Sequence, residues 1–600
     1  MSRIRTLLLM SVSALIVVIL SCAAAPAATP SSTELTGGVK SSSGKPMEGV
    51  AVSARANNKT YTTTVYSDQN GGYYFPPLDS GHYKVWAQAV GFEPGRSELE
   101  ISSGKREQRD FTLKTMPDFH RQLSGTEWLE SLPDDTPGDR RQVEIINHNC
   151  TNCHAVNFML QNRFDAAGWG KIVNLMEKIA MPGYLPENGA PANPVLYTLV
   201  QEYKEEMVAY LTKVRGPENY PLKYKPFPRP TGEATQIVVT EFDISRADHP
   251  DFISEHNGSN WSEGTPAKFF GYNVHDTAVD KEGNAWFSDD VTPERTIGKL
   301  DPKTGKVTNY KLPEEDNSAA RSHGIALDPS GNVWFTNESE GSLTKFDPKT
   351  EQFTRFPRPK PSPPARITLA SDSKGNIWAV NEDGAYKLEP ETGKYTAYKS
   401  PSKGGGTYGI AVDAKDNAWY TQLHIDRNVV VDSRTGKVSD VTLSPEETDI
   451  MTDKDRQISA RKIGTNSATP LDHKGPRRLA ADQRGDSVWV AEYWGGRLAK
   501  IDINTKKVTE YSVPHPLSHP YAVAVDKNHM VWVSMTNSDT IVKFNPYTER
   551  FTEYHLPTLG TEIRWVAIDD RTDVPTVWLP YNRASKLARV QFRSASGTTP

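Results

Sequence analysis

The chain has 600 residues, among them 43 prolines and 42 glycines, with a net charge of −5 and a mean hydropathy of −0.59. This length exceeds what one hydrophobic core usually serves, so several domains are expected. Charges of both signs are interspersed and no basic block stands out, which argues against nucleic acid as a partner. The abundant glycine and proline favour many turns and short strands over long helices.

The first 30 residues have the layout of a secretory signal. Arg3 and Arg5 precede an apolar run over residues 7–20, and small residues follow it. We therefore expect an exported protein, periplasmic or anchored to the outer membrane. Residues 19–22 also resemble a bacterial lipobox, which implies a lipid anchor on Cys22; cleavage within residues 23–28 is the alternative. The apolar run is shorter than a membrane-spanning helix requires.

Residues 33–117 predict a small antiparallel β-sandwich. Apolar residues alternate with small or polar ones along residues 50–54 and 83–87, between turn sequences rich in glycine and serine. The characteristic runs lie at residues 44–46, 49–52, 67–75, 81–85 and 91–92. They resemble the carboxypeptidase regulatory-like family, which has a transthyretin-like fold. The resemblance implies a non-catalytic spacer or binding module, and Asp68 with Asn70 should form a turn rather than a calcium site.

Residues 118–217 change to a helical period. Two sets of apolar residues recur at intervals of three and four, as one face of a helix does: Leu196, Leu199, Val200, Tyr203, Met207, Tyr210, Leu211 and Val214, and, in a shorter helix, Trp169, Ile172, Val173 and Met176. Upstream of both helices lies Cys150-Thr151-Asn152-Cys153-His154, the C-x-x-C-H haem attachment signature. Each thiol can form a thioether with a haem vinyl group, and His154 then ligates the iron. The sequence therefore predicts covalent haem c at Cys150, Cys153 and His154.

Two other kinds of site use a pair of cysteines at this spacing. A structural zinc ion needs four ligands; His148 would supply a third, but nothing obvious supplies the fourth, because the only other cysteine is Cys22. A thioredoxin-like redox pair needs alternating strands and helices around it, which this region lacks. One cysteine for lipid and two for haem leave none for a disulfide.

A helix that ends just before the motif, a middle helix and a longer terminal helix resemble the small cytochrome c fold. The candidates for the sixth iron ligand are Met176, on the apolar face of the middle helix, and Met181, which opens a Met-Pro-Gly loop often seen at the distal methionine of cytochromes. Either methionine can instead fill the core. An open or histidine-ligated iron is the remaining alternative. Histidine and methionine ligation favours electron transfer, whereas an open iron can react with a small molecule.

From residue 232 to residue 594 the sequence repeats with a period of about 40–50 residues and one tryptophan in each unit. In each unit an aspartate precedes the tryptophan by six or more residues. The seven pairs are Asp280/Trp286, Asp328/Trp334, Asp372/Trp378, Asp413/Trp419, Asp482/Trp489, Asp526/Trp532 and Asp569/Trp578. The repeat predicts a seven-bladed β-propeller, so the expected fold is multidomain and mainly β, with a small β-sandwich, an α-helical cytochrome c-like domain and the propeller.

The ends of the repeat region predict how the ring closes. The last unit stops one strand short after residue 590, and residues 236–242, before the first unit, have the pattern of a detached outer strand. We expect the two to pair, because this would cover open strand edges. Residues 444–474 are an insertion between the fourth and fifth units, and we expect a loop there to act as a lid over the pocket.

Residues 322–328 and 331–336 resemble the repeat of the virginiamycin B lyase family, a seven-bladed propeller that opens a streptogramin lactone by elimination with Mg²⁺ assistance. The position five residues before each anchor aspartate should lie near the central channel. It is occupied in turn by His275, His323, Ile367, Tyr408, Arg477, Tyr521 and Arg564. In the lyases, histidines at this position in the last two blades carry out acid–base chemistry, and a glutamate two residues before the final one helps to hold the metal. Here Tyr521 and Arg564 take those places, while Glu562 matches the glutamate.

The candidate catalytic residues of the propeller are His275, His323, Tyr408, Tyr521 and Glu562. An imidazole pair suits proton transfer near neutral pH, and the resemblance implies Mg²⁺ beside Glu562. The alternative is that these are polar groups lining a solvated channel.

Three functions fit this organisation. The first is electron transfer through haem to or from a small-molecule substrate or a redox partner protein at the propeller. The second is a lyase or hydrolase on the propeller with the cytochrome as an electron port. The third is a scaffold in which the propeller and sandwich display the cytochrome. The first and third share electron transfer, which is our prediction; catalysis, by a haem-linked oxidoreductase or a lyase, stays open.

Overall fold

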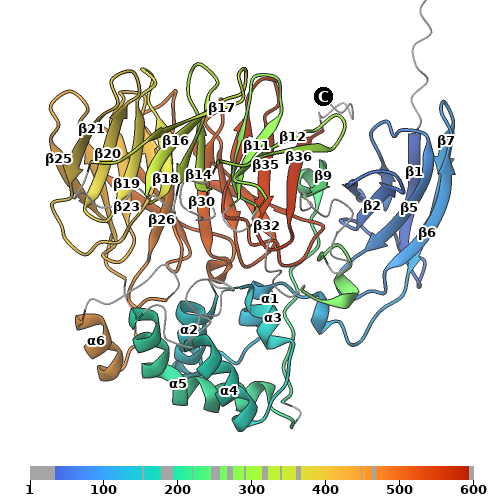
Figure 1. The fold of residues 1–600 in the computed structure, drawn as a ribbon. Coiled ribbons are helices and arrows are strands. Elements are labelled where there is room, and N and C mark those ends of the chain that lie inside the picture. Colours follow the sequence, from blue (N-terminus) through green and yellow to red (C-terminus); the bar gives the residue numbers. More distant parts are fainter. Residues whose placement is uncertain are drawn as a thin grey trace, which may run out of the picture.

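The computed structural model describes residues 34–151, 154–177, 194–218, 220–244, 257–265, 274–289, 292, 294–313, 322–337, 341–359, 366–446, 449–461 and 468–593. They form a sandwich, a helical unit below a propeller, and the propeller itself (Figure 1). The signal segment with Cys22, and also Cys153 and Met181, lie outside the described residues. Within the described residues, none of the helices is long and apolar enough to cross a membrane.

The N-terminal sandwich packs two sheets over one apolar core. In the first sheet β1 (Glu34–Ser41) pairs with β4 (Gly72–Tyr74), β7 (Arg106–Gln108) and β8 (Phe111–Leu113); the second has the order β3 (Tyr61–Tyr66), β2 (Ala51–Ala56), β5 (Gly81–Gln88) and β6 (Gly95–Ile101). The period-two prediction is confirmed around residues 83–85, because Tyr83 and Val85 are buried while Lys84 between them is exposed; along residues 51–54 every residue is buried. The predicted turn is confirmed as well, since Asp68 Oδ1 accepts hydrogen bonds from the backbone N–H groups of Asn70 and Gly72 at 2.8 Å.

The helical unit follows the sandwich in the chain. It contains α1 (Gly125–Glu130), α2 (Pro137–Cys150), α3 (Val156–Leu160), α4 (Ala166–Glu177) and α5 (Pro194–Arg215), preceded by the 3-10 turn η1 (His120–Gln122). Thr136 caps α2, because its side chain accepts a hydrogen bond from the Asp139 N–H and Pro137 occupies the first turn. The predicted apolar face of α5 is confirmed: from Leu199 to Val214 its members are at most 5% exposed.

Seven four-stranded blades form the propeller in the described part of the chain, and their innermost strands contact one another around a ring. The first six are β10 (Val274–Val279), β11 (Ala285–Asp289), β12 (Ile297–Asp301) and β13 (Lys306–Tyr310); β14 (Ser322–Leu327), β15 (Val333–Asn337), β16 (Ser342–Asp347) and β17 (Gln352–Phe356); β18 (Arg366–Ser371), β19 (Ile377–Asn381), β20 (Gly384–Glu389) and β21 (Lys394–Lys399); β22 (Thr407–Val412), β23 (Ala418–Gln422), β24 (Arg427–Val431) and β25 (Val438–Thr442); β26 (Pro476–Ala481), β27 (Ser487–Glu492), β28 (Arg497–Asp502) and β29 (Val508–Ser512); and β30 (Pro520–Val525), β31 (Val531–Met535), β32 (Thr540–Asn545) and β33 (Arg550–His555). Short 3-10 turns η2 (Gly232–Thr235), η3 (Trp261–Glu263) and η4 (Pro516–Ser518) lie outside the blades.

The aspartate and tryptophan anchors have a structural reason. Where the spacing is six residues, the indole N–H donates to the aspartate, as from Trp334 to Asp328 at 2.9 Å. The same bond forms in the other four units of this spacing. In the two units with longer spacing it is replaced: Trp489 donates to Ser487, and Trp578 has no hydrogen-bond partner among the described residues. The bond fixes each tryptophan against the turn between the first two strands of its blade.

The seventh blade confirms the predicted closure of the ring. Its strands are β34 (Ala567–Asp569), β35 (Thr576–Tyr581), β36 (Lys586–Phe592) and β9 (Ile237–Asp243), so the outermost strand comes from before the first blade. The other edge of β9 pairs with β3 of the sandwich, which makes one eight-stranded sheet across both units. Asp243 links the two sides, because it binds Lys586 of the blade at 2.7 Å and Arg55 of the sandwich at 2.5 Å.

The described residues of the insertion at 444–474 form more than the predicted loop, and its role as a lid stays a prediction. This insertion carries α6 (Asp453–Ala460), and α6 lies beside α5 and α2 of the helical unit (Figure 1). Ile458 and Leu471 of the insertion share an apolar core with Ile145 of α2 and Tyr203 of α5. The insertion therefore links the helical unit to the propeller, because its apolar side chains pack against α2 and α5.

Candidate functional site

A buried polar group occupies the centre of the propeller at the ends of the innermost strands. We call it the hub and define it by ten residues: His275, Asp276, His323, Tyr408, Arg477, Arg478, Tyr521, Glu562, Arg564 and Arg583. All five predicted catalytic residues of the propeller belong to it. Ile367, at the same repeat position, supplies a backbone carbonyl.

The two hub histidines form a ring pair with centroids 3.7 Å apart. His275 Nδ1 lies 2.8 Å from Asp276 Oδ1, and His323 Nδ1 lies 2.9 Å from the Ile367 carbonyl oxygen. With Nδ1 as the donor in each ring, the lone pair of both imidazoles lies on Nε2. Ile367 adopts the left-handed conformation, with φ of 61°, which is costly for a β-branched residue. The strain is consistent with a backbone shaped to present this carbonyl.

Both histidines are neutral at physiological pH. Burial lowers the pKa of His275 well below its usual value, and the positive charges of Arg478 and Arg564 lower it further. Burial and the neighbouring ring of His275 lower the pKa of His323 in the same way. Neutral imidazoles with such low pKa values are weak bases, so their position alone does not make them strong proton acceptors.

The hub also contains a pair of tyrosines next to its arginines. The hydroxyl groups of Tyr408 and Tyr521 share a hydrogen bond, and the Arg477 guanidinium lies 5.0 and 4.7 Å from the centroids of their rings. Burial raises the pKa of Tyr521, but the charges of Arg477 and Arg564 lower it by more, so the net shift is downward. Burial raises the pKa of Tyr408, its partner. Tyr521 is therefore the hub hydroxyl that ionises more readily.

Glu562 is held by arginines. Its Oε2 lies 2.9 Å from Arg583 Nε and 3.3 Å from Arg564 Nη2. Mg²⁺ prefers several carboxylate, carbonyl or water oxygens, and here the carboxylate is already paired with two cations. His275, Asp276 and His323 do place one ligand atom each within 4.8 Å of one another. This set is rich in nitrogen, and Arg478 already binds Asp276, so the described hub residues do not fit Mg²⁺.

Sequence reasoning missed three members of the hub. Arg478 and Asp276 each follow directly after a residue at the predicted repeat position, and Arg583 lies in the turn between β35 and β36. Arg478 and Asp276 form an ion pair at 2.8 Å across the ring, 202 residues apart in sequence. The sequence does place an acidic and a basic residue directly after the predicted channel position in two units. It does not show that these two residues pair, because only the closed ring brings them together.

The haem motif begins at the end of α2. Cys150 is the last residue of this helix and is half-buried between the two apolar clusters of the helical unit. His154 Nδ1 lies 3.1 Å from the Ala155 carbonyl oxygen, and its ring contacts Phe158 edge-on at 5.9 Å. Cys153 between them is outside the described residues. Met176 is half-buried near the end of α4, and Met181 falls in a segment the structure does not describe.

A series of aromatic side chains connects α2 with the hub. The His148 ring, two residues before Cys150, stacks on Trp494 with centroids 5.9 Å apart. Trp494 contacts Tyr493 edge-on at 5.1 Å, and Tyr493 contacts Tyr521 at 5.8 Å. All four rings of the series are buried. Ring contacts thus run without a break from His148 of α2 to Tyr521 of the hub.

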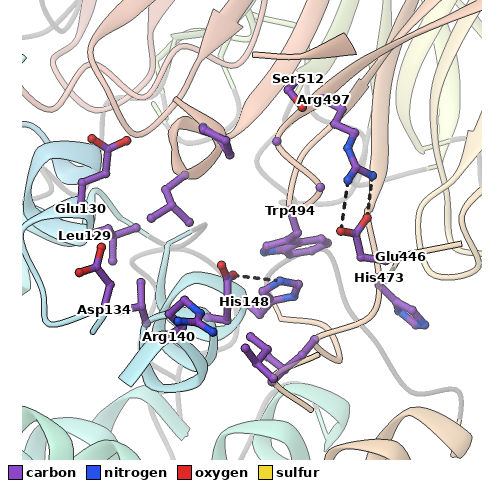
Figure 2. Close-up of a pocket in the computed structure, with 18 of the residues that line it drawn as sticks. Leu129, Glu130, Asp134, Arg140, His148, Glu446, His473, Trp494, Arg497 and Ser512 are labelled. Atoms are coloured by element: carbon purple, nitrogen blue, oxygen red, sulfur yellow. Dashed lines mark hydrogen bonds and ion pairs between the residues drawn. The ribbon is translucent and has the colours of Figure 1, made fainter. Parts of the chain in front are cut away.

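A cavity of about 600 Å³ lies beside this series, between α1 and α2 on one side and the propeller on the other. Figure 2 shows His148 beneath Trp494, with Glu446 and Arg497 on the propeller side. Glu446 binds Arg497 at 2.8 Å, and Glu144 lies 3.6 Å from His148. Burial lowers the pKa of His148 to about 3, whereas burial and the charge of Glu446 raise the pKa of Glu144 to about 7.

Comparison with known proteins identifies one domain. Residues 34–114 match the family model of the carboxypeptidase regulatory-like domain, which confirms the prediction for the sandwich. No curated protein matches the chain.

Among solved structures, the chain is similar to a streptogramin B lyase, at 19% identity over 60% of this chain and all of that chain, with a TM-score of 0.46. It is also similar to virginiamycin B lyase from Staphylococcus aureus, at 16% identity over 59% of this chain and 99% of that chain (TM-score 0.45). A third likeness is the extracellular domain of a putative one-component system from B. thetaiotaomicron, at 12% identity over 55% of this chain and 40% of that chain (TM-score 0.39).

Proposed function

We propose that the protein is an exported c-type cytochrome that transfers electrons between haem c on the helical unit and a substrate or partner protein at the propeller. The observation that carries the proposal is the C-x-x-C-H motif, which starts at the last residue of a buried helix that packs against the propeller. A zinc site is less well supported, because the His148 ring stacks on Trp494 and, among the described residues, no cluster of potential metal ligands includes it.

The described residues fit the group. In a haem ligand the second ring nitrogen normally donates to a carbonyl or carboxylate, which fixes the ring and its tautomer. The Nδ1 of His154 has such an acceptor in the Ala155 carbonyl, so the lone pair is on Nε2. When bound, the haem would supply a one-electron carrier or an iron ligand site. Met176 and Met181 stay the candidates for its distal ligand.

The chain's own residues would provide the connection. The insertion with α6 holds the helical unit in one position, and the ring contacts from His148 through Trp494 to Tyr521 place polarisable groups between the motif and the hub. Such a packed connection allows electrons to pass more readily than a gap filled with water. The partner would then be either a small molecule at the hub or a redox protein at the surface.

The first test is spectroscopic. The protein would be produced in a host that matures c-type cytochromes, and its pyridine haemochrome spectrum compared with that of the Cys150→Ala/Cys153→Ala variant. We expect a covalent haem signal in the wild type and none in the variant. A methionine–iron charge-transfer band that disappears in Met176→Ala or in Met181→Ala would identify the distal ligand. A wild type without covalent haem would reject the proposal.

Export and lipidation form a separate part of the proposal. It rests on the signal-like first 30 residues and on Cys22, as set out from the sequence. Cell fractionation should find the wild type in the membrane fraction and Cys22→Ala in the periplasm. Wild-type protein in the cytoplasm would contradict it.

A lyase is the second candidate, and the paired His275 and His323 favour it. Their lone pairs on Nε2 suit proton abstraction, although their low pKa values weaken them as bases. Opening of a streptogramin B lactone by the haem-free variant, lost in His275→Ala, would place this function first. No turnover would leave electron transfer as the preferred function.

A further inference from the structure

Arg478 carries a buried and unused hydrogen-bonding edge. Its side chain is 1% exposed, and its Nη1 donates to Asp276 Oδ2 at 2.8 Å. Its Nε and Nη2 have no acceptor among the described residues. These two nitrogens form the edge of the guanidinium that binds a carboxylate through two parallel hydrogen bonds. Leaving a buried donor without an acceptor is unfavourable.

The same chain shows what this edge binds elsewhere. Arg141 Nε and Nη2 donate to the two oxygens of Asp455 at 2.7 and 2.8 Å. Arg571 uses the same pair of nitrogens on Asp569, at 2.7 and 2.6 Å. In Arg478 no carboxylate of the described residues binds this edge. Its two donors could therefore bind the carboxylate of a ligand.

The charge of the hub also favours an anion. Four guanidinium groups meet two carboxylates, Asp276 and Glu562, and both carboxylates already bind arginine. The carboxylate of Asp539, which is not part of the hub, does not offset this charge by binding an arginine of the hub. It accepts hydrogen bonds from the backbone N–H groups of Gly560 and Thr561. The two histidines add no positive charge but offer an acceptor, because His275 Nε2 has no hydrogen-bond partner among the described residues.

A cavity in the propeller lies next to this group. This cavity of about 390 Å³ is lined by the innermost strands, including the small residues Ala278, Ala326, Ala370, Ala411, Ala480 and Ala524. Trp565 also lines the cavity, and the Arg478 guanidinium lies 4.7 Å from the centroid of one of its rings. Most side chains that line the cavity are thus apolar, and Trp565 at its border lies next to the Arg478 guanidinium.

We propose that the hub binds a small carboxylate with an apolar body, whose two oxygens accept hydrogen bonds from Nε and Nη2 of Arg478 while the body lies towards Trp565. In the function proposed above, this carboxylate would be the substrate bound at the propeller. Only its role as a substrate rests on that function. Binding itself requires no haem.

Benzoate and benzamide make a direct test, because they share their shape and only benzoate carries the charge. At matched ionic strength, benzoate should raise the Tm of the wild-type protein and give a saturable calorimetric titration, while benzamide should do neither. Equal effects of the two compounds, or no binding of benzoate, would overturn the proposal. The latter result would mean that water alone satisfies Arg478. This comparison needs no variant.

Arg478→Lys keeps the charge but removes the bidentate edge, so it should weaken benzoate binding about tenfold or more, as expected for the loss of a charge-assisted hydrogen bond. Arg571→Lys is the matched control: it alters the same kind of edge outside the hub and should bind benzoate as the wild type does. Equal affinity in Arg478→Lys, or an equal loss in Arg571→Lys, would refute the role of Arg478.

The haem proposal is separated by one more variant. Cys150→Ala/Cys153→Ala should retain benzoate binding even though it would carry no covalent haem. If the wild-type protein itself contained no haem and still bound benzoate, the electron-transfer function would be rejected and the carboxylate site would be kept. Loss of binding in this variant would show that the site depends on the helical unit, against the proposal.

Discussion

Glu144 gives the interface between the helical unit and the propeller a pH dependence at the level of one residue. Its pKa in the folded protein is about 7, raised by burial and by Glu446, against an ordinary value of 4.5. The folded state thus holds the proton more tightly, and wild-type stability should fall as pH rises from about 4.5 to 7. Glu144→Gln should remove this loss and be more stable than the wild type by about 1–2 kcal/mol at pH 8, after allowing for partial exposure. Thermal unfolding from pH 5 to pH 8 measures the difference.

The matched control for this prediction is Glu205→Gln, an exposed residue of the neighbouring helix α5. It should follow the wild type at every pH. An advantage of Glu144→Gln that is the same at pH 5 and pH 8 would show that the effect comes from packing and not from titration.

The residues of the hub were predictable only in part. The repeat places His275, His323, Tyr408 and Tyr521 towards the channel, since one register applies to all blades. It does not reveal that Arg478 pairs with Asp276 or that arginines neutralise Glu562. Those contacts depend on which blades face each other, a property of the closed ring that no local pattern contains.

At the scale of elements, α6 is one of the contacts that join the helical unit to the propeller. Asp455 at its start binds Arg141 of α2 through two hydrogen bonds, with both side chains almost fully buried. Asp455→Ala would leave the guanidinium charge buried beside Glu206 alone, so we expect a loss of about 3 kcal/mol and faster amide hydrogen exchange in α6 and α2. The Asp455 pKa of about 2 means that the wild type keeps this contribution down to about pH 4 and loses it as pH falls towards 2.

Asp453→Ala, on the same helix with a side chain that is 99% exposed, is the control and should change neither stability nor exchange. Unchanged exchange in Asp455→Ala would mean that the apolar contacts hold α6 by themselves. The length of the insertion was visible in the sequence, but its docking was not: Asp455 and Arg141 lie 314 residues apart, and a short amphipathic segment does not indicate its partner.

The whole molecule is organised by the eight-stranded sheet that runs from the seventh blade into the sandwich. The missing strand of the last repeat predicts the pairing of β36 with β9. The pairing of β3 with β9 was not predictable, because valine- and threonine-rich strands fit many neighbours equally well. In β9 every residue from Ile237 to Asp243 is buried, which reflects partners on both edges and both faces.

Removal of residues 34–114 would expose the outer edge of β9. An unpaired, largely apolar edge favours pairing with another chain, so we expect the truncated protein to self-associate more strongly than the full chain at the same concentration. Size-exclusion chromatography with light scattering distinguishes the two. A monomeric truncated protein would show that the edge is covered by other means.

The double pairing of β9 also bears on the order of events during synthesis. This strand leaves the ribosome long before β36, its partner in the ring, because the whole propeller lies between them in the chain. A folded sandwich can receive β9 as soon as it emerges and hold it extended on β3. The sandwich would then act as a template that keeps an aggregation-prone segment ordered until the final blade arrives to complete the circle.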